Sequence, residues 1–351
     1  MATSSSLTLS SATFAKLSPH PYLLANLQPA DASVPSSRTN GRQPQQARSP
    51  NINTSSLSHA HGSAVVRTGD TTVICGVRGE TLLTTAIPNY RAPDASSMAA
   101  VNEVRDYDLL VPNIELATGC APNFLPGVPP TTLAQTLSTR VYSLLQSSKL
   151  VDVDRLRIYQ QTDFGNKSKD EEEDEGEKNK GDEKHEEEAD EDLSAEKVVK
   201  AYWVLYIDVL FISFDGNPFD AAWAAVLAAL RDTKLPEAYW DIDQELVLCR
   251  RTKTPSPLTL QGFPVACTAA VFTAKEKQRK GSDQYWILAD PDRLEESLCD
   301  ETVSMVIDKS SGTTKVLGIS KSGGVVVGPR LMRDIAALAN VRWDQFHSAM
   351  K

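Results

Sequence analysis

The 351-residue sequence lacks an apolar run long enough to cross a membrane as a helix. The run at 221–230 is shorter than the roughly 18 to 20 residues that a bilayer requires, and charged residues flank it. The Ser/Thr-rich start has no arginine before Arg38, which argues against a transit peptide. These patterns predict no membrane partner.

Cysteine is also scarce and has no metal-binding pattern. The five cysteines contain no C-x-x-C pair, which favours buried, reduced thiols over disulfides or a zinc site. His59 and His61 have a spacing that could share a metal ion, but no third ligand is in view. The sequence therefore predicts no metal and no cofactor.

Most of the chain carries no net charge, although the total is −10. Residues 166–192 contain 15 Asp/Glu and 5 Lys, which leaves 46 − 15 = 31 acids and 36 − 5 = 31 bases elsewhere. This segment has no aromatic residue and cannot bury enough apolar surface to offset the entropy of ordering, so we expect disorder there. The acidic total is thus no evidence against RNA binding.

The pattern of apolar residues predicts a mixed α and β fold. The sequence GSAVVRTGDTTVICGV at 62–77 predicts a hairpin, and the nearly all-apolar 203–214 predicts a central strand covered on both faces. Helices are expected at 12–27, where proline interrupts the helix, at 220–231, and from Pro329 onward. A further helix is expected to begin after Thr131 or Thr132, with Leu133 on its inner face. Further strands are expected at 109–116, 151–159, 263–273, 284–289, 302–308 and 314–319, and 28–56 reads as extended and loosely held.

Four stretches of the sequence together resemble RNase PH-like proteins. Within that family they resemble the non-catalytic ring subunits of the RNA exosome, a branch that is similar to the inactive ring subunit of the archaeal exosome. These are the hairpin at 62–77, RTNGR at 38–42, the strand, turn and helix at 203–237, and LADPDRLEESLCDETVSMVID at 288–308. The resemblance implies an α+β RNase PH-like domain, with mixed β-sheets, crossover helices and a ribosomal-protein-like βαβ core. The expected organisation is an N-terminal arm at 1–57, the first part of the domain at 58–165, the acidic insert at 166–192, and the second part at 193–351.

Active members of that family cleave RNA with inorganic phosphate, held in a D-G-G-T-R-T-like turn at the start of a helix. The matching run here is 215–220, DGNPFD. Pro218 removes an amide donor, Phe219 replaces the arginine, and Asp220 places a negative charge where phosphate would lie. This comparison predicts that the phosphate site is absent.

The other two site elements of the family are also altered. Thr302 stands at the expected position of a metal-binding aspartate, with Asp300 and Glu301 beside it as alternatives, and the late loop at 322–324 lacks a glutamate. Asp208 inside the central strand could be a buried catalytic carboxylate or a hydrogen-bonded structural residue. The acidic cluster at 290–296 could bind a metal or form a solvated turn.

The resemblance implies a structural rather than catalytic role in 3′-to-5′ RNA processing and degradation, with an active phosphate-dependent exoribonuclease as the alternative. Implied partners are other RNase PH-like ring subunits, OB-fold and KH cap subunits, a hydrolytic nuclease and single-stranded RNA. The implied location is the nucleus, nucleolus and cytoplasm. Arg78, Arg91 and Arg105 flank the loop at 81–106, which faces the RNA channel in related subunits, so they are RNA-binding candidates or ordinary surface arginines.

Overall fold

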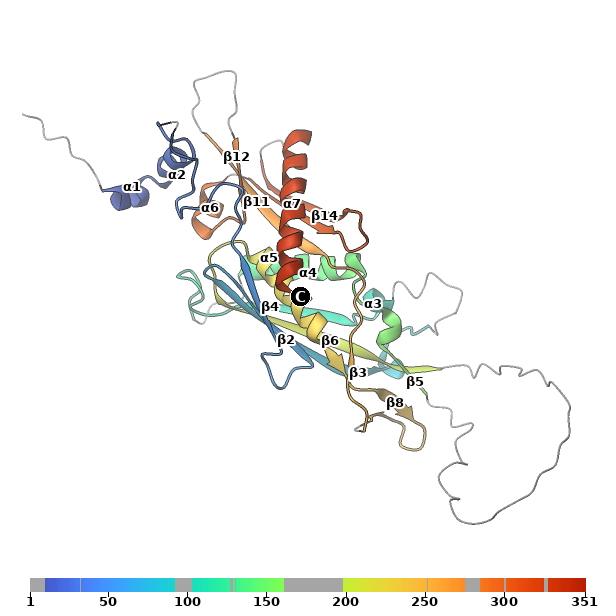
Figure 1. Cartoon of the computed structure of the whole chain (residues 1–351). Coiled ribbons are helices and arrows are strands. Elements are labelled where there is room, and N and C mark those ends of the chain that lie inside the picture. Colours follow the sequence, from blue (N-terminus) through green and yellow to red (C-terminus); the bar gives the residue numbers. More distant parts are fainter. Residues whose placement is uncertain are drawn as a thin grey trace, which may run out of the picture.

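Two β-sheets face a shared helix, α5 (Pro218–Asp232), which packs against strands of both sheets in the computed structural model (Figure 1). Every residue of α5 from Phe219 to Leu230 is buried, because its alanines let the strands approach closely. The structure describes residues 10–31, 33–91, 103–126, 129, 131–160, 198–250, 252–274, 285–299, 301–324 and 328–351.

The first sheet has the strand order β1-β2-β3-β6-β4, with β5 also paired to β6. Its strands pair antiparallel except for β4 and β6, which are parallel and are joined through the crossover helix α4 (Thr132–Ser148). This pair forms the expected βαβ unit. The bounds are β1 Pro50–Thr54, β2 Gly62–Thr68, β3 Thr71–Leu83, β4 Leu110–Leu116, β5 Arg157–Tyr159 and β6 Val199–Ser213.

The second sheet is antiparallel with the order β12-β11-β13-β14, and α7 packs against β11 and β13. Its elements are β11 Val265–Thr273, β12 Tyr285–Ala289, α6 Arg293–Leu298, β13 Glu301–Asp308, β14 Lys315–Gly323 and α7 Pro329–Ala349. The remaining elements are α1 Ser11–Leu17, α2 Pro19–Leu27, η1 Thr84–Ala86, α3 Glu103–Asp106, η3 Val153–Arg155, β7 Lys234–Leu235, β8 Ala238–Asp241, β9 Leu246–Cys249 and β10 Ser256–Pro257.

The hairpin of β2 and β3 and the start of α4 follow their sequence signals. Gly69 has a positive φ of 60° at the hairpin turn, where glycine meets no steric penalty. Thr131 caps α4 by accepting a hydrogen bond from the amide of Ala134 at 3.3 Å. Leu133 was expected on the inner face of α4 but is exposed, because Ala134 and Leu137 occupy the side that packs on β4.

The prediction that the central strand is covered on both faces is wrong for its second half. Leu210 and Ile212 of β6 are 38% and 49% exposed, because α5 covers only the opposite face of the first sheet there. The strand expected at 151–159 is also too long, since only Arg157–Tyr159 pairs with β6 and a 3-10 helix at Val153–Arg155 precedes it.

Residues 28–56 are held firmly, contrary to the expectation from their composition. Arg38 is 1% exposed and forms an ion pair with the buried Glu295. β1 pairs with β2, and the preceding helix α2 packs Leu23 against the second sheet. Composition could not predict this, because one buried ion pair and one strand pairing decide it.

The acidic insert at 166–192 lies outside the described residues, so its predicted disorder stays a prediction. In the described ranges, no helix is both long and apolar enough to span a membrane. None of the five cysteines, all of which lie in the described ranges, forms a disulfide, and burial raises the pKa of Cys75 and Cys267, which keeps both thiols protonated.

Candidate functional site

The turn that opens α5 is shaped by two residues with left-handed backbone. Gly216 has a φ of 76° and Asn217 a φ of 49°. A Cβ at Gly216 would lie 2.5 Å from the backbone nitrogen of Arg293, so only glycine allows the loop before α6 to approach this closely. The turn therefore brings Asp290, which follows β12, and Glu296, on α6, against the N-terminus of α5.

Carboxylates accept the hydrogen bonds that Asn217 donates at this turn. The backbone amide of Asn217 donates to Glu296 Oε1 at 2.8 Å, and Pro218 has no amide hydrogen. The side-chain amide of Asn217 donates to Asp220 at 2.9 Å and to Asp290 at 2.8 Å. The positive end of the helix thus interacts with carboxylates of the protein itself.

Burial raises the pKa of Glu296 to about 7, although the amide of Asn217 and the charge of Arg48 act in the opposite direction. Burial also raises the pKa of Asp220, which is 4% exposed. A phosphate dianion placed here would displace one carboxylate and lie beside the others, which is electrostatically unfavourable.

Asp220 joins α5 to the second sheet. Its carboxylate accepts hydrogen bonds from the backbone amide and the hydroxyl of Thr268 on β11, both at 2.7 Å. The Thr268 hydroxyl lies 2.8 Å from that of Ser304 on β13. With all these contacts inside the protein, Asp220 has the environment of a structural carboxylate.

Phe219 is buried at the position of the family's phosphate-binding arginine, but a cation from another helix lies over its ring. The guanidinium of Arg140, on α4, is 3.9 Å from the ring centroid and has no ion pair with any residue that the structure describes. Sequence reasoning missed Arg140, because a lone arginine on a helix gives no signal of such a tertiary contact.

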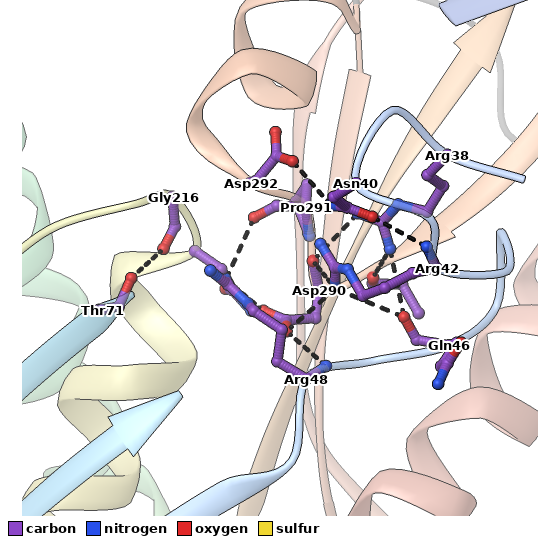
Figure 2. Close-up of polar contacts among 12 residues, drawn as sticks. Arg38, Asn40, Arg42, Gln46, Arg48, Thr71, Gly216, Asp290, Pro291 and Asp292 are labelled. Carbon is purple, nitrogen blue, oxygen red and sulfur yellow. Dashed lines mark hydrogen bonds and ion pairs between the residues drawn. The ribbon is translucent and has the colours of Figure 1, made fainter. Parts of the chain in front are cut away.

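Asp290 and Glu295 of the acidic cluster at 290–296 lie in a buried ion-pair network with the N-terminal arm rather than in a solvated turn, and Figure 2 shows the part around Asp290. Arg48 donates from Nε and Nη2 to the two carboxylate oxygens of Asp290, each at 2.8 Å. Although burial alone would raise the pKa of Asp290, Arg48 keeps it well below its usual range. Arg42 lies 3.5 Å from the same carboxylate.

The RTNGR motif supplies the rest of this network. Arg38 donates from Nη1 to the carbonyl of Ala289 at 2.7 Å and from Nε to the carboxylate of Glu295. Its planar guanidinium group thus makes hydrogen bonds from more than one nitrogen. Asn40 donates to Asp292 at 2.9 Å (Figure 2). A second negative charge at position 40 would repel Asp292.

Two of the three residues at the expected metal position are described by the structure. Glu301 is buried 3.1 Å from Lys321 Nζ, and Thr302 offers no charge. Asp300 lies outside the described residues. In the ranges that are described, no group of three or more His, Cys, Asp or Glu side chains could hold a metal ion.

The other candidates have structural surroundings. Asp208 is exposed rather than buried, and accepts a hydrogen bond from Asn113 at 3.3 Å. His61 Nδ1 accepts from the amide of Gly79 at 3.0 Å, which ties the segment just before β2 to β3. Gly323 is the last residue of the edge strand β14, and Gly324 follows it in a bend.

The three candidate RNA-binding arginines are all exposed, and two of them lie near one tyrosine. The backbone of Arg91 contacts the hydroxyl of Tyr107 at 3.4 Å, and Arg105 lies two residues before Tyr107 at the end of α3. Arg105 also lines a pocket of about 550 Å³ between α3 and α4. Arg78 is farther along β3, where it pairs with Glu80 at 3.0 Å and lies over Tyr206. Their role in RNA binding stays a prediction.

Comparisons with known proteins agree with this architecture. Models of the 3′ exoribonuclease family match residues 46–236 (domain 1) and residues 262–339 (domain 2). A Schizosaccharomyces pombe protein named exosome complex component rrp43 is 30% identical over 330 residues, with 94% of each chain covered. Exosome complex component Rrp42 of Archaeoglobus fulgidus is 26% identical over 85% of each chain.

Solved structures show the same fold. A chain of the Archaeoglobus fulgidus exosome with RNA bound to the active site matches with a TM-score of 0.62 at 22% identity, covering 95% of this chain and 97% of that one. An archaeal exosome core matches with a TM-score of 0.56. Together with the two matched domains and the S. pombe relative, this shows that the chain belongs to the RNase PH-like 3′ exoribonuclease family.

Proposed function

We propose that this chain is a non-catalytic structural subunit of the RNA exosome core ring, with a role in 3′-to-5′ RNA processing and degradation. The observation that carries the proposal is the hydrogen bond from the Asn217 amide to Glu296, at the place where active relatives bind phosphate. The names of the relatives support membership of the ring, since the S. pombe and archaeal proteins are exosome components.

The proposed partners of such a subunit are other RNase PH-like ring subunits, the OB-fold and KH cap subunits, a hydrolytic nuclease and single-stranded RNA. The edge strand β14 and the uncovered half of β6 leave sheet surfaces that neighbouring subunits would cover. The proposed locations are the nucleus, nucleolus and cytoplasm, where RNA is matured and degraded.

Catalysis is tested with the purified chain, alone and with the subunit that pairs with it, on single-stranded RNA with inorganic phosphate. We expect no release of nucleoside diphosphates above a reaction without phosphate. Phosphate-dependent release that depends on this chain would establish the alternative, an active phosphorolytic exoribonuclease. Size-exclusion chromatography of a native extract tests ring membership, because a ring subunit elutes in a large assembly and a free RNA-binding protein does not.

The contribution of Arg78, Arg91 and Arg105 to RNA binding is tested by changing all three to glutamate in the assembled particle. If each contacts a phosphate, the slope of log affinity against log salt becomes less steep by up to about 2, since each contact to single-stranded nucleic acid contributes about 0.7. Reversal of Arg330 and Arg333, two exposed arginines of α7, is the matched control. An unchanged slope in the triple variant would remove these arginines from the RNA path.

A further inference from the structure

Arg342, on α7, is a buried cation with an incomplete set of hydrogen bonds, and it is 3% exposed. Its Nη1 donates to the carbonyl of Arg48 at 2.5 Å and to Gln345 Oε1 at 2.9 Å. Its Cζ lies 4.5 Å from the ring centroid of Phe346. Nε and Nη2 are also buried, yet no group in the described part of the chain accepts a hydrogen bond from either of them. Because a buried charge is costly unless its donors are paired, these two nitrogens require an acceptor.

The same side chain lines a cavity of about 70 Å³, where the N-terminal arm, α7 and the second sheet meet. Asp220 and Asp290 line it as well, together with Cys267 on β11. Burial raises the pKa of the Cys267 thiol, the charges of Asp220 and Asp290 raise it further, and the charge of Arg342 acts in the opposite direction. The thiol therefore lies within electrostatic reach of all three groups. Since a water molecule takes up about 30 Å³ in the liquid, the cavity has room for about two.

The charges around this cavity favour a neutral occupant. Arg342, Asp220 and Asp290 are the charged residues that line it among those the structure describes. Asp290 is already paired with Arg48 at 2.8 Å, and Arg42 lies 3.5 Å from the same carboxylate. An anion in the cavity would lie beside two carboxylates, and a cation would lie beside a guanidinium, so both are electrostatically unfavourable.

Asp220 can accept a further hydrogen bond, whereas Asp290 cannot. Each oxygen of Asp290 already accepts two hydrogen bonds, which come from Arg48 and Asn217. Asp220 Oδ2 also accepts two, from the Asn217 side chain and the Thr268 amide. Within the described ranges, Asp220 Oδ1 accepts from the Thr268 hydroxyl alone. Because a carboxylate oxygen has two lone pairs, Asp220 Oδ1 has one acceptor position left.

We propose that ordered water fills this cavity and bridges the guanidinium of Arg342 to the carboxylate of Asp220. Nε–H and Nη2–H lie on the same side of the planar guanidinium, so they can donate to one water molecule or to two neighbouring ones. Water suits the site because it is neutral, accepts from Arg342 and donates to Asp220 Oδ1. The bridge joins α7 to α5 beside the N-terminal arm, and it lies within this chain whether or not the chain is part of a ring.

A crystal structure of the full-length chain, alone or in its assembly, tests the site directly at a resolution that shows ordered water. We expect at least one water molecule within hydrogen-bond distance of Arg342 Nε or Nη2 and of an Asp220 oxygen. A second crystal soaked in sodium bromide distinguishes water from an anion, because bromide gives an anomalous signal. Bromide in the cavity, a cavity without ordered water, or a direct ion pair between Arg342 and Asp220 would each overturn the proposal.

Urea unfolding in a double-mutant cycle tests the same bridge in solution. Cys267→Leu places a larger apolar side chain in the cavity and should displace the water. We expect this change to raise the unfolding equilibrium constant about tenfold more in the parent than in the Arg342→Met background, because only the parent is left with unpaired buried donors. Strain from the larger side chain is present in both backgrounds and cancels in the comparison.

Arg333→Met, which removes an exposed arginine of the same helix, is the matched control and should show no coupling to Cys267→Leu. An equal effect of Cys267→Leu in the parent and in the Arg342→Met background would contradict a water-bridged Arg342. The crystallographic test requires no variant, so it decides the question even if Arg342→Met does not fold.

Discussion

Replacement of Glu296 by glutamine should stabilise the protein at alkaline pH and have little effect at pH 5. The carboxylate accepts the Asn217 amide, and a glutamine oxygen can accept the same hydrogen bond. Burial raises the pKa of Glu296 from its usual 4.5 to about 7. Between these values the folded protein holds a proton that the unfolded chain has released, so the free energy of unfolding falls as the pH rises through this window and stays low above it.

The size of the effect follows from the two pKa values. A difference of about 2.5 between 7 and 4.5, at about 1.4 kcal/mol for each pKa unit, sets an upper limit of about 3 kcal/mol. Because the side chain is half-buried and solvent screens it in part, we expect about 1 to 2 kcal/mol at pH 8.

Urea unfolding followed by circular dichroism at pH 5 and pH 8 measures this difference. Asp243→Asn, which removes an exposed carboxylate of the β8–β9 hairpin, is the control and should show no pH-dependent difference from the parent protein. A glutamine variant that is less stable than the parent at pH 8, or equally stable at both pH values, would refute the view that an ionised Glu296 at the α5 N-terminus is destabilising.

Two further predictions concern the contacts around this turn. Arg38→Met leaves Glu295 buried without its partner and should lower the free energy of unfolding by about 3 to 5 kcal/mol, whereas Arg78→Met breaks an exposed pair and should cost less than about 1 kcal/mol. Equal losses in urea unfolding would contradict the assignment of Arg38 as a buried anchor. Gly216→Ala forces a Cβ against the backbone of Arg293 at a positive φ and should cost about 2 kcal/mol or more, while Gly312→Ala, also at positive φ but with open space around it, should cost only about 1 kcal/mol.

The elements that sequence alone predicted are those whose signal is local. The hairpin at 62–77 alternates β-favouring residues around a glycine turn, and α5 and α7 begin with proline at the first helical turn. The altered phosphate turn could also be seen in sequence, because proline and phenylalanine at 218 and 219 change hydrogen-bonding capacity whatever the fold around them.

What sequence could not predict depends on contacts between distant segments. Nothing local distinguishes Arg38, which is buried against Glu295, from Arg78, which is exposed on β3. The second half of β6 reads as a strand covered on both faces, but which faces are covered depends on where the helices pack. The position of Glu296 on the Asn217 amide was invisible for the same reason, since 79 residues separate the two.

The carboxylates at the α5 turn and the anchoring of the N-terminal arm belong to one arrangement. An anion-binding turn needs amide donors that are unsatisfied until the ligand arrives, and here Glu296 and Asp290 satisfy the donors of Asn217 permanently. Carboxylates buried at this depth require cations, which Arg48 provides directly to Asp290. Arg48 lies just before β1. Its ion pair with Asp290, beside the α5 turn, therefore holds the N-terminal arm between the two sheets. Phosphate binding at this turn would therefore require more than an arginine at position 219, since removal of the carboxylates would leave the arginines of the arm without partners.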